Sequence, residues 1–232
     1  MGLMLLAKPA IESQERTLPS LARSEPAVSS VAADPRARLR DIIAARSFRF
    51  GQTFRLASGA ESNVYFNMKP TMFDPEGAAL MARLVVERLA RDGIDAVGGL
   101  EMGAVPIVAA ATVQSQLTGR PIRGFFVRKK AKEHGARLRI EGLAADESLK
   151  GKRIAVIDDV CTTGGSAIQA VDEVREAGGD VVLALAIVDR EEGAAANFRE
   201  HGLAFDALYR AREFIPEGFE RANPDPARER PD

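Results

Sequence analysis

The chain has 232 residues, 46% of them hydrophobic, so it can bury a substantial core in one large domain or two small ones. Its formal net charge of −1 excludes the global positive field that would gather nucleic acid or an anionic membrane surface as a partner. The single cysteine, Cys161, excludes an internal disulfide and a multi-cysteine metal cluster, so we expect a cytoplasmic protein.

Both ends of the chain are predicted to be flexible. Residues 1–35 show no sustained helical or strand period, and the last 17 residues are polar and charged. Eight of the 12 prolines lie in these two regions. We therefore expect a flexible extension over 1–35, a folded domain over 36–215 and a flexible tail over 216–232.

The folded part begins with a small non-parallel unit over 36–73, here called the hood. Apolar residues at helical spacing predict a helix over 36–46, and short strands follow. The segment NVYFNMK alternates between apolar and polar residues, which predicts a strand with Phe66 on one face and Lys69 on the other. One of these faces can line a pocket.

From Asp74 the pattern changes to alternating helices and strands. Asp74 suits an N-cap and Pro75 the first helical position. Strands are predicted at AVGGL, IRGFFV, RIAVID and VVLALAIV, with helices after Pro106 and from about 166 to 177. This alternation predicts an α/β fold, a parallel sheet with helices on both faces. The apolar run VVLALAIV is far shorter than the roughly 20 residues that cross a bilayer.

The strongest chemical signal is RIAVIDDVCTTGGSA. Its strand ends in two carboxylates, Asp158 and Asp159, where a parallel sheet presents its ligand-binding edge. In the loop Cys161–Ser166, two glycines let N–H groups converge, three hydroxyls add donors, and the next helix adds a positive N-terminus. The loop suits a phosphate monoester, and the carboxylates suit the hydroxyls of a ribose.

Each of these residues also has an ordinary structural explanation. The carboxylates can cap the loop, and the glycines can serve a tight turn. The combination favours a ligand that carries ribose beside phosphate, and the absence of GxxxxGK[ST] and GxGxxG disfavours the usual triphosphate and dinucleotide cradles. Cys161 has no adjacent base, so we expect a small buried residue and not a nucleophile.

The segment IAVIDDVCTTGGSA resembles the phosphoribosyl pyrophosphate (PRPP) signature of the type I phosphoribosyltransferases. The resemblance implies that family's fold, a parallel sheet flanked by helices with the small N-terminal hood. The PRPP-binding residues that it implies are Asp158, Asp159, Val160, Cys161, Thr162, Thr163, Gly164, Gly165 and Ser166.

The basic segment VRKKAKEHG follows the predicted strand IRGFFV. Its cations can close over a leaving pyrophosphate, although such a run alone is more often a solvated surface. The segment resembles the mobile catalytic loop of orotate phosphoribosyltransferases, which reaches into the neighbouring subunit, and so implies a homodimer with shared active sites. The expected catalytic residues are Arg128, Lys129, Lys132 and His134.

The acceptor site is predicted where Arg190 ends the strand VVLALAIV. A guanidinium there can make a two-point hydrogen bond to a planar acid, which suits orotate. The alternative is an ion pair of Arg190 with Asp189 or Glu191. The family resemblance runs from about residue 38 to 214, includes LASGAESNVYFNMK and GLEMGAVP, and favours binding. The expected orotate contacts are Phe66, Lys69, Thr162 and Arg190.

Two positions depart from the family pattern, since Ala57 and Gly103 stand where many relatives carry lysine. Lys69 can replace one of them, although an ordinary surface lysine is the more common role for such a residue. The resemblance implies transfer of ribose 5-phosphate from PRPP to N1 of orotate, which gives orotidine 5-monophosphate and pyrophosphate in UMP biosynthesis. Mg²⁺ is the expected cofactor, held mainly by pyrophosphate and ribose oxygens and not directly by the protein.

Two other functions stay open at this stage. The PRPP signature does not choose a base, so a phosphoribosyltransferase for another base is one alternative. A non-catalytic regulator that senses PRPP is the other, although residues 1–35 are too irregular for a DNA-reading helical domain. Competition among bases tests the first alternative, and tight ligand binding without turnover would indicate the second.

Overall fold

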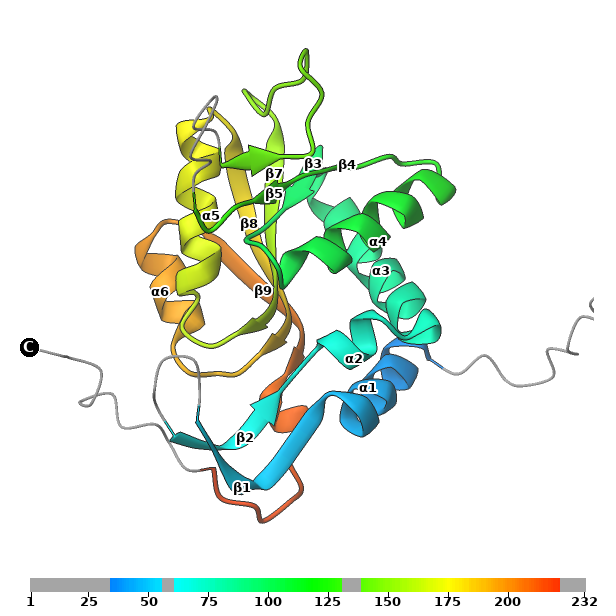
Figure 1. Ribbon diagram of the computed structural model, residues 1–232, viewed down its shortest axis with the longest axis vertical. Helices are drawn as coiled ribbons and strands as arrows, with labels where there is room; N and C mark the ends of the chain where they lie inside the picture. Colours follow the sequence, from blue (N-terminus) through cyan, green and yellow to red (C-terminus); the bar gives the residue numbers. More distant parts are fainter. Residues whose placement is uncertain (1–33, 56–60, 131–138, 222–232) are drawn as a thin grey trace, which may run out of the picture. The chain divides into compact units, whose positions relative to one another are not determined.

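The computed structural model describes residues 34–55, 61–130 and 139–221, which contain a five-stranded parallel sheet (Figure 1). The strands are β3 (Ala96–Gly98), β4 (Arg123–Gly124), β7 (Arg153–Cys161), β8 (Asp180–Asp189) and β9 (Ala204–Arg210). Their order is β4-β3-β7-β8-β9, and every neighbouring pair is parallel. The predicted α/β fold is confirmed. The strand order reverses between β3 and β7, and sheets of this kind bind ligands beyond the carboxyl ends of the strands at that point.

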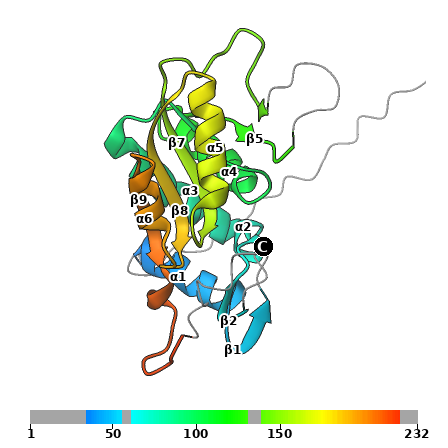
Figure 2. The same cartoon turned by 90° about the vertical axis from the view of Figure 1, so that its left-hand side faces the viewer.

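Different helices cover the two faces of the sheet (Figure 1). Because side chains alternate along a strand, Ala155 and Ile157 of β7 join one core cluster while Ile154 and Val156 join the other. The first cluster includes residues of α3 and α4, and the second includes residues of α5 and α6. Figure 2 shows α5 lying along β7 and β8. These helices are α3 (Pro75–Leu89), α4 (Ala104–Leu117), α5 (Gly165–Glu176) and α6 (Ala194–Glu200).

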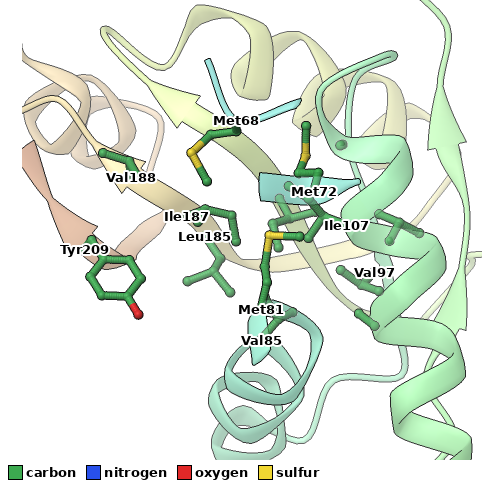
Figure 3. Close-up of a cluster of buried hydrophobic side chains, with 14 of the residues drawn as sticks. Met68, Met72, Met81, Val85, Val97, Ile107, Leu185, Ile187, Val188 and Tyr209 are labelled. Carbon is green, nitrogen blue, oxygen red and sulfur yellow. The ribbon is translucent and has the colours of Figure 1, made fainter. Parts of the chain in front are cut away.

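Aliphatic and methionine side chains fill the core on the α3 and α4 side (Figure 3). Met81 of α3, Ile107 of α4 and Leu185 of β8 are almost completely buried there. Met68 and Met72, which belong to the hood, lie in the same cluster. Methionine fills irregular gaps well, which suits the join between the hood and the sheet.

The hood consists of two helices and an antiparallel strand pair: α1 (Pro35–Arg46), β1 (Phe48–Arg55), β2 (Glu61–Phe66) and α2 (Lys69–Met72). Phe66 and Met68 are buried, as their alternation predicted. The prediction that the strand continues to Lys69 is wrong. β2 ends at Phe66, and Lys69 is an exposed residue that begins α2, where Pro70 suits the first turn of a helix.

Several parts of the sheet region differ from the sequence prediction. The segment IRGFFV forms two strands, because β4 joins the main sheet while β5 (Phe126–Val127) pairs with β6 (Ile140–Glu141). β7 continues through the acidic pair to Cys161, which pairs with Asp189 of β8. The sequence patterns did not predict α2, β6, α6, β9 or two short 3-10 helices, η1 (Ala90–Asp92) and η2 (Ala211–Glu213).

Residues that follow η2 contact the hood (Figure 1). The ring of Phe214 lies 5.4 Å from that of Phe66, and the ring of Phe219 meets Phe50 edge-on at 5.3 Å. Residues 216–221 therefore pack on the hood although they fall within the predicted flexible tail. Within the described ranges, no helix combines the length and hydrophobicity that a membrane crossing requires.

Candidate active site

Asp158 and Asp159 lie near the carboxyl end of β7, beside the point where the strand order reverses. Asp158 is buried, and its two oxygens accept hydrogen bonds from the Ser166 hydroxyl at 2.5 Å and the Asp159 N–H at 3.0 Å. Burial, followed by the charge of Asp159, raises the pKa of Asp158 to about 7. This carboxyl group is therefore poised to change protonation state near neutral pH.

The loop after β7 leads directly into the N-terminus of α5. Gly164, the N-cap residue, has a φ of 88°, a left-handed backbone that favours glycine. Since glycine offers no capping side chain, the first N–H groups of α5 are available to an anion. Thr163 and Ser166 are exposed beside them, and Thr162 is half-buried.

Helix α6 supports this loop through contacts that no sequence pattern predicted. Asn197 donates a hydrogen bond from its side-chain nitrogen to the carbonyl of Thr163 at 2.9 Å. A Cβ atom placed on Gly164 would lie 2.9 Å from Cζ of Phe198. Asn197 and Phe198 of α6 therefore fix the position of the loop through contacts with Thr163 and Gly164.

The loop between β3 and α4 approaches the acidic pair. A Cβ atom placed on Gly103 would lie only 2.5 Å from Oδ1 of Asp159, so this position has space for hydrogen alone unless Asp159 moves. In the same loop, a side-chain oxygen of Glu101 accepts a hydrogen bond from the backbone N–H of Lys129 at 2.9 Å. The basic segment therefore begins beside the loop that contacts Asp159.

The structure describes two of the four predicted catalytic residues. The Arg128 guanidinium lies 3.6 Å from the carboxylate of Glu141, and Lys129 is exposed. Lys132 and His134 lie outside the described residues. The catalytic roles of all four stay predictions.

Arg190 lies immediately after β8, and only 3% of it is exposed. Its Nη2 atom donates to the hydroxyl of Ser62 at 3.0 Å and to the carbonyl of Val64 at 3.2 Å, both in β2 of the hood. The same atom lies 2.8 Å from the carboxylate of Glu192. Burial lowers the pKa of the Arg190 guanidinium. Arg190 therefore joins the hood to the carboxyl end of the sheet.

The two acids that the sequence offered as ion-pair partners of Arg190, Asp189 and Glu191, both pair with other residues. Asp189 pairs with Arg210 at 3.4 Å, and Glu191 pairs with Arg212 at 3.1 Å. The partner of Arg190 is Glu192, which lies two residues further along the chain. The motif DREE contains this glutamate, but it also contains two other acids, and the sequence does not indicate which of the three pairs with Arg190.

The other predicted site residues have mixed environments. Phe66 packs against Phe48 at 4.9 Å in the hood core, which supports a packing role for its ring. Lys69 is exposed at the start of α2. Cys161 is buried at the end of β7, and burial raises the pKa of its thiol, as expected for a small structural residue.

Comparison with known proteins identifies close relatives of the chain. Residues 73–197 match the family model described as phosphoribosyl transferase domain. An orotate phosphoribosyltransferase from Bradyrhizobium sp. (strain ORS 278) is 61% identical over 180 residues, which cover 78% of this chain and 97% of the relative. The orotate phosphoribosyltransferase from Rhodopseudomonas palustris (strain BisB18) is 59% identical, with coverage of 78% and 96%.

Solved structures of related proteins share the fold. The orotate phosphoribosyltransferase of Mycobacterium tuberculosis H37Rv in complex with Fe(III) dicitrate has a TM-score of 0.68 and 34% identity, covering 79% of this chain and 100% of that one. A structure of that enzyme in complex with PRPP has a TM-score of 0.62 and 31% identity, covering 78% and 92%.

Proposed function

Because the chain belongs to the orotate phosphoribosyltransferases of the type I phosphoribosyltransferase family, we propose that it transfers ribose 5-phosphate from PRPP to N1 of orotate. The products are orotidine 5-monophosphate and pyrophosphate, which places the reaction in UMP biosynthesis. The observation that carries the proposal is the cradle over Asp158–Ser166. It combines two carboxylates, a left-handed glycine and an uncapped helix N-terminus at the ligand-binding edge of the sheet.

Residues Asp158–Ser166 hold PRPP in this proposal. The 5-phosphate binds over residues 162–166, where backbone N–H groups and hydroxyls converge. The ribose hydroxyls donate hydrogen bonds to Asp158 and Asp159, which as carboxylates would repel a phosphate placed in the same position.

Arg190 binds the acceptor in this proposal, with Thr162 beside it. The Arg190 guanidinium, the Glu192 carboxylate and the Arg221 guanidinium lie within contact distance and together carry one excess positive charge. Orotate is an anion, so its carboxylate complements that charge, while neutral uracil and purines do not. This charge balance favours orotate over the alternative bases. Phe66 and Lys69 remain candidate contacts.

In the chemical step, N1 of orotate releases its proton to water and forms a bond to C1 of the ribose, while the bond from C1 to the pyrophosphate oxygen breaks. Positive charge develops on the ribose ring and negative charge on the leaving group. Four basic residues of the segment after β5 stabilise the departing pyrophosphate. They are Arg128, Lys129, Lys132 and His134.

Mg²⁺ is the proposed cofactor, and the donor set near the cradle fits it. Mg²⁺ typically keeps several waters and binds one or two carboxylates together with substrate phosphates. Here the ligands are mainly pyrophosphate and ribose oxygens, and Asp158 and Asp159 act on the ion only indirectly, through the ribose hydroxyls that they bind. When bound, the ion would neutralise charge on pyrophosphate.

A homodimer with shared active sites is also proposed, and the outer face of α4 supports it. Val105, Ala109, Val113 and Leu117 recur every four residues on this helix, and Val113 and Leu117 are 61% and 76% exposed. Val113 and Leu117 also line a pocket of about 540 Å³. An apolar stripe on an exposed helix face is suited to burial against a second copy of the chain.

The proposed compartment is the cytoplasm. One cysteine in the sequence leaves no internal disulfide to maintain, which supports a reducing compartment.

The test of the enzymatic proposal is a turnover assay with the purified full chain, PRPP and Mg²⁺. Orotate consumption and orotidine 5-monophosphate formation are the expected readouts, with uracil, adenine and guanine supplied in competition. We expect orotate to be used and the other bases to leave its rate unchanged. Turnover of another base without orotate would replace the proposed acceptor, and PRPP binding with no turnover of any base would indicate a PRPP-sensing protein.

A further inference from the structure

The segment 216–221 connects the hood to the predicted acceptor site. Its Phe219 ring meets Phe50 of β1 edge-on at 5.3 Å. The Asn63 side chain of β2 donates a hydrogen bond to the carbonyl of Glu220 at 2.8 Å. Both hood strands are therefore in contact with this segment, which brings the next residue, Arg221, to the end of β8.

Arg221 makes two contacts with the end of β8. Its Nη2 atom donates to the carbonyl of Arg190 at 2.8 Å and to Oε1 of Glu192 at 2.7 Å. The Arg190 side chain approaches the same carboxylate oxygen at 2.8 Å. One oxygen of Glu192 is therefore shared between two guanidinium groups, which are 4% and 25% exposed for Arg190 and Arg221 respectively.

This cluster has unused hydrogen-bonding capacity. Among the described residues, three buried side-chain atoms have no hydrogen-bond partner, and two of them are Nε of Arg190 and Oε2 of Glu192. Buried polar atoms are normally paired because an unpaired one loses its hydration without compensation. The unpaired Nε donor of Arg190 and the excess positive charge of the cluster favour an anionic ligand, whereas Oε2 of Glu192 is an acceptor that opposes one.

We infer that Arg221 is a positioning residue for the acceptor site, which acts on Arg190 through the shared carboxylate of Glu192. The inference rests on the proposed function, because it takes orotate as the ligand of Arg190. Arg221 neutralises Glu192, so that the positive charge of Arg190 remains available to the carboxylate of the acceptor. Its bond to the Arg190 carbonyl also fixes the backbone from which that guanidinium extends.

Loss of Arg221 has a defined electrostatic consequence. Glu192 would then have Arg190 as its sole cationic contact in this cluster, and the two charges would cancel. An incoming carboxylate would have to compete with a buried carboxylate for one guanidinium, where low solvent exposure strengthens the competition. Acceptor binding should weaken, whereas PRPP binding at the end of β7 should not.

The test compares steady-state kinetics of the full-length wild type, Arg221→Ala and Arg221→Lys. We expect Arg221→Ala to raise the KM for orotate by roughly tenfold, the effect of one lost charge-assisted hydrogen bond, and to change the KM for PRPP by less than about twofold. Arg221→Lys keeps the charge beside Glu192 and should recover much of the loss. Arg212→Ala is the matched control, because Arg212 pairs with the neighbouring Glu191 at 3.1 Å and not with Glu192.

A double-mutant cycle identifies the route of the effect. In a Glu192→Gln background the competing charge is absent, so Arg221→Ala should raise the KM for orotate by roughly twofold or less. Thermal denaturation of each variant verifies that it is folded. An equal effect of Arg221→Ala in both backgrounds would overturn the route through Glu192.

The remaining outcomes are distinguishable. If the wild type uses orotate and Arg221→Ala leaves its KM unchanged, or raises the KM for PRPP equally, the inference fails and the proposed function stands. If the wild type does not use orotate, both fail. If Arg221→Lys restores nothing while Arg212→Ala has the same defect, the effect is a general one on stability and the positioning role is rejected.

Discussion

The carboxyl group of Asp158 makes the stability of the ligand-free protein depend on pH. Its pKa rises from 3.8 to about 7, first because it is buried and then because of Asp159. A carboxyl whose pKa is higher in the folded state binds more protons there, so the free energy of unfolding falls as pH rises from about 4 to 7.

The matching experiment measures thermal denaturation of the wild type and Asp158→Asn between pH 5 and pH 8. We expect the melting temperature of the wild type to fall across this range by at least about 3 °C more than that of the variant, which corresponds to about 1 kcal/mol. Asp180→Asn, a change of the same type at an exposed position, should retain the wild-type slope. Equal slopes for wild type and Asp158→Asn would contradict the assignment.

Cys161 provides a second test at the scale of one residue. It is 1% exposed inside the proposed PRPP-binding run, and burial raises its thiol pKa, so the neutral thiol dominates. We expect Cys161→Ala and Cys161→Ser to keep turnover within about threefold of the wild type, because a covalent step needs a thiolate. Alkylation should require unfolding. A loss of activity by orders of magnitude in both variants would show that the thiol takes part in the reaction.

Individual residues differ in how well the sequence predicted their surroundings. Asp158, Gly164 and Ser166 follow one another closely in the chain, so their proximity could be predicted from a strand, a loop and a helix. The partner of Arg190 could not be predicted in this way, because the Arg190 guanidinium can reach any of several acids and also Ser62, which is 128 residues away in the sequence. Side-chain pairing of that kind is decided by packing in three dimensions.

The loop between β7 and α5 depends on its first glycine more than on its second. Gly164 has a φ of 88°, and a Cβ there would lie 2.9 Å from the Phe198 ring, whereas a Cβ on Gly165 would find its nearest neighbour, Thr163 Oγ1, at 3.9 Å. We expect Gly164→Ala to reduce the free energy of unfolding by at least about 1–2 kcal/mol. Gly165→Ala should change it by less than about 0.5 kcal/mol.

Chemical denaturation of the two glycine variants beside the wild type tests this difference. The comparison concerns stability alone, because both positions belong to the proposed phosphate site. If both variants lose the same stability, the left-handed turn and the Phe198 contact do not distinguish the two positions.

Whole elements were predictable where their pattern was strong. The buried strands β7 and β8 and the capped helix α3 have long apolar runs or clear helical spacing. α6 is only seven residues long and lacks a capping side chain, and the edge strand β9 has mostly half-buried residues without alternation. The segment IRGFFV was assigned one strand because its division at Phe125 is imposed by two different pairing partners.

For the whole molecule, the apolar face of α4 carries the prediction of a dimer. We expect Leu117→Asp to shift the protein toward monomer and to reduce activity per chain, because the proposed active sites are shared between subunits. Phe73→Asp is the matched control, since Phe73 is 74% exposed and Leu117 76%, but Phe73 lies outside α4. Sedimentation velocity of wild type and both variants measures the result. A wild-type monomer, or a Leu117→Asp protein that remains dimeric, would contradict this interface.

Long-range contacts set the limit of sequence prediction at this scale. The parallel sheet could be inferred from alternating elements, but the attachment of residues 216–221 to the hood could not. The Asn63 side chain reaches Glu220 across 157 positions of sequence, and no local periodicity records such a contact. Polar and proline-rich composition predicted a flexible tail, whereas two aromatic residues, Phe214 and Phe219, hold this part of it against the hood.

The close approach of Gly103 to Asp159 has a consequence for protein engineering. Transplanting the lysine of many relatives into this position would place new atoms where the Asp159 carboxylate now lies. Such a graft therefore requires the Asp159 side chain to turn away from its present position. A lysine at position 103 would therefore act on the proposed ribose site through the displaced Asp159 carboxylate as well as through its own charge.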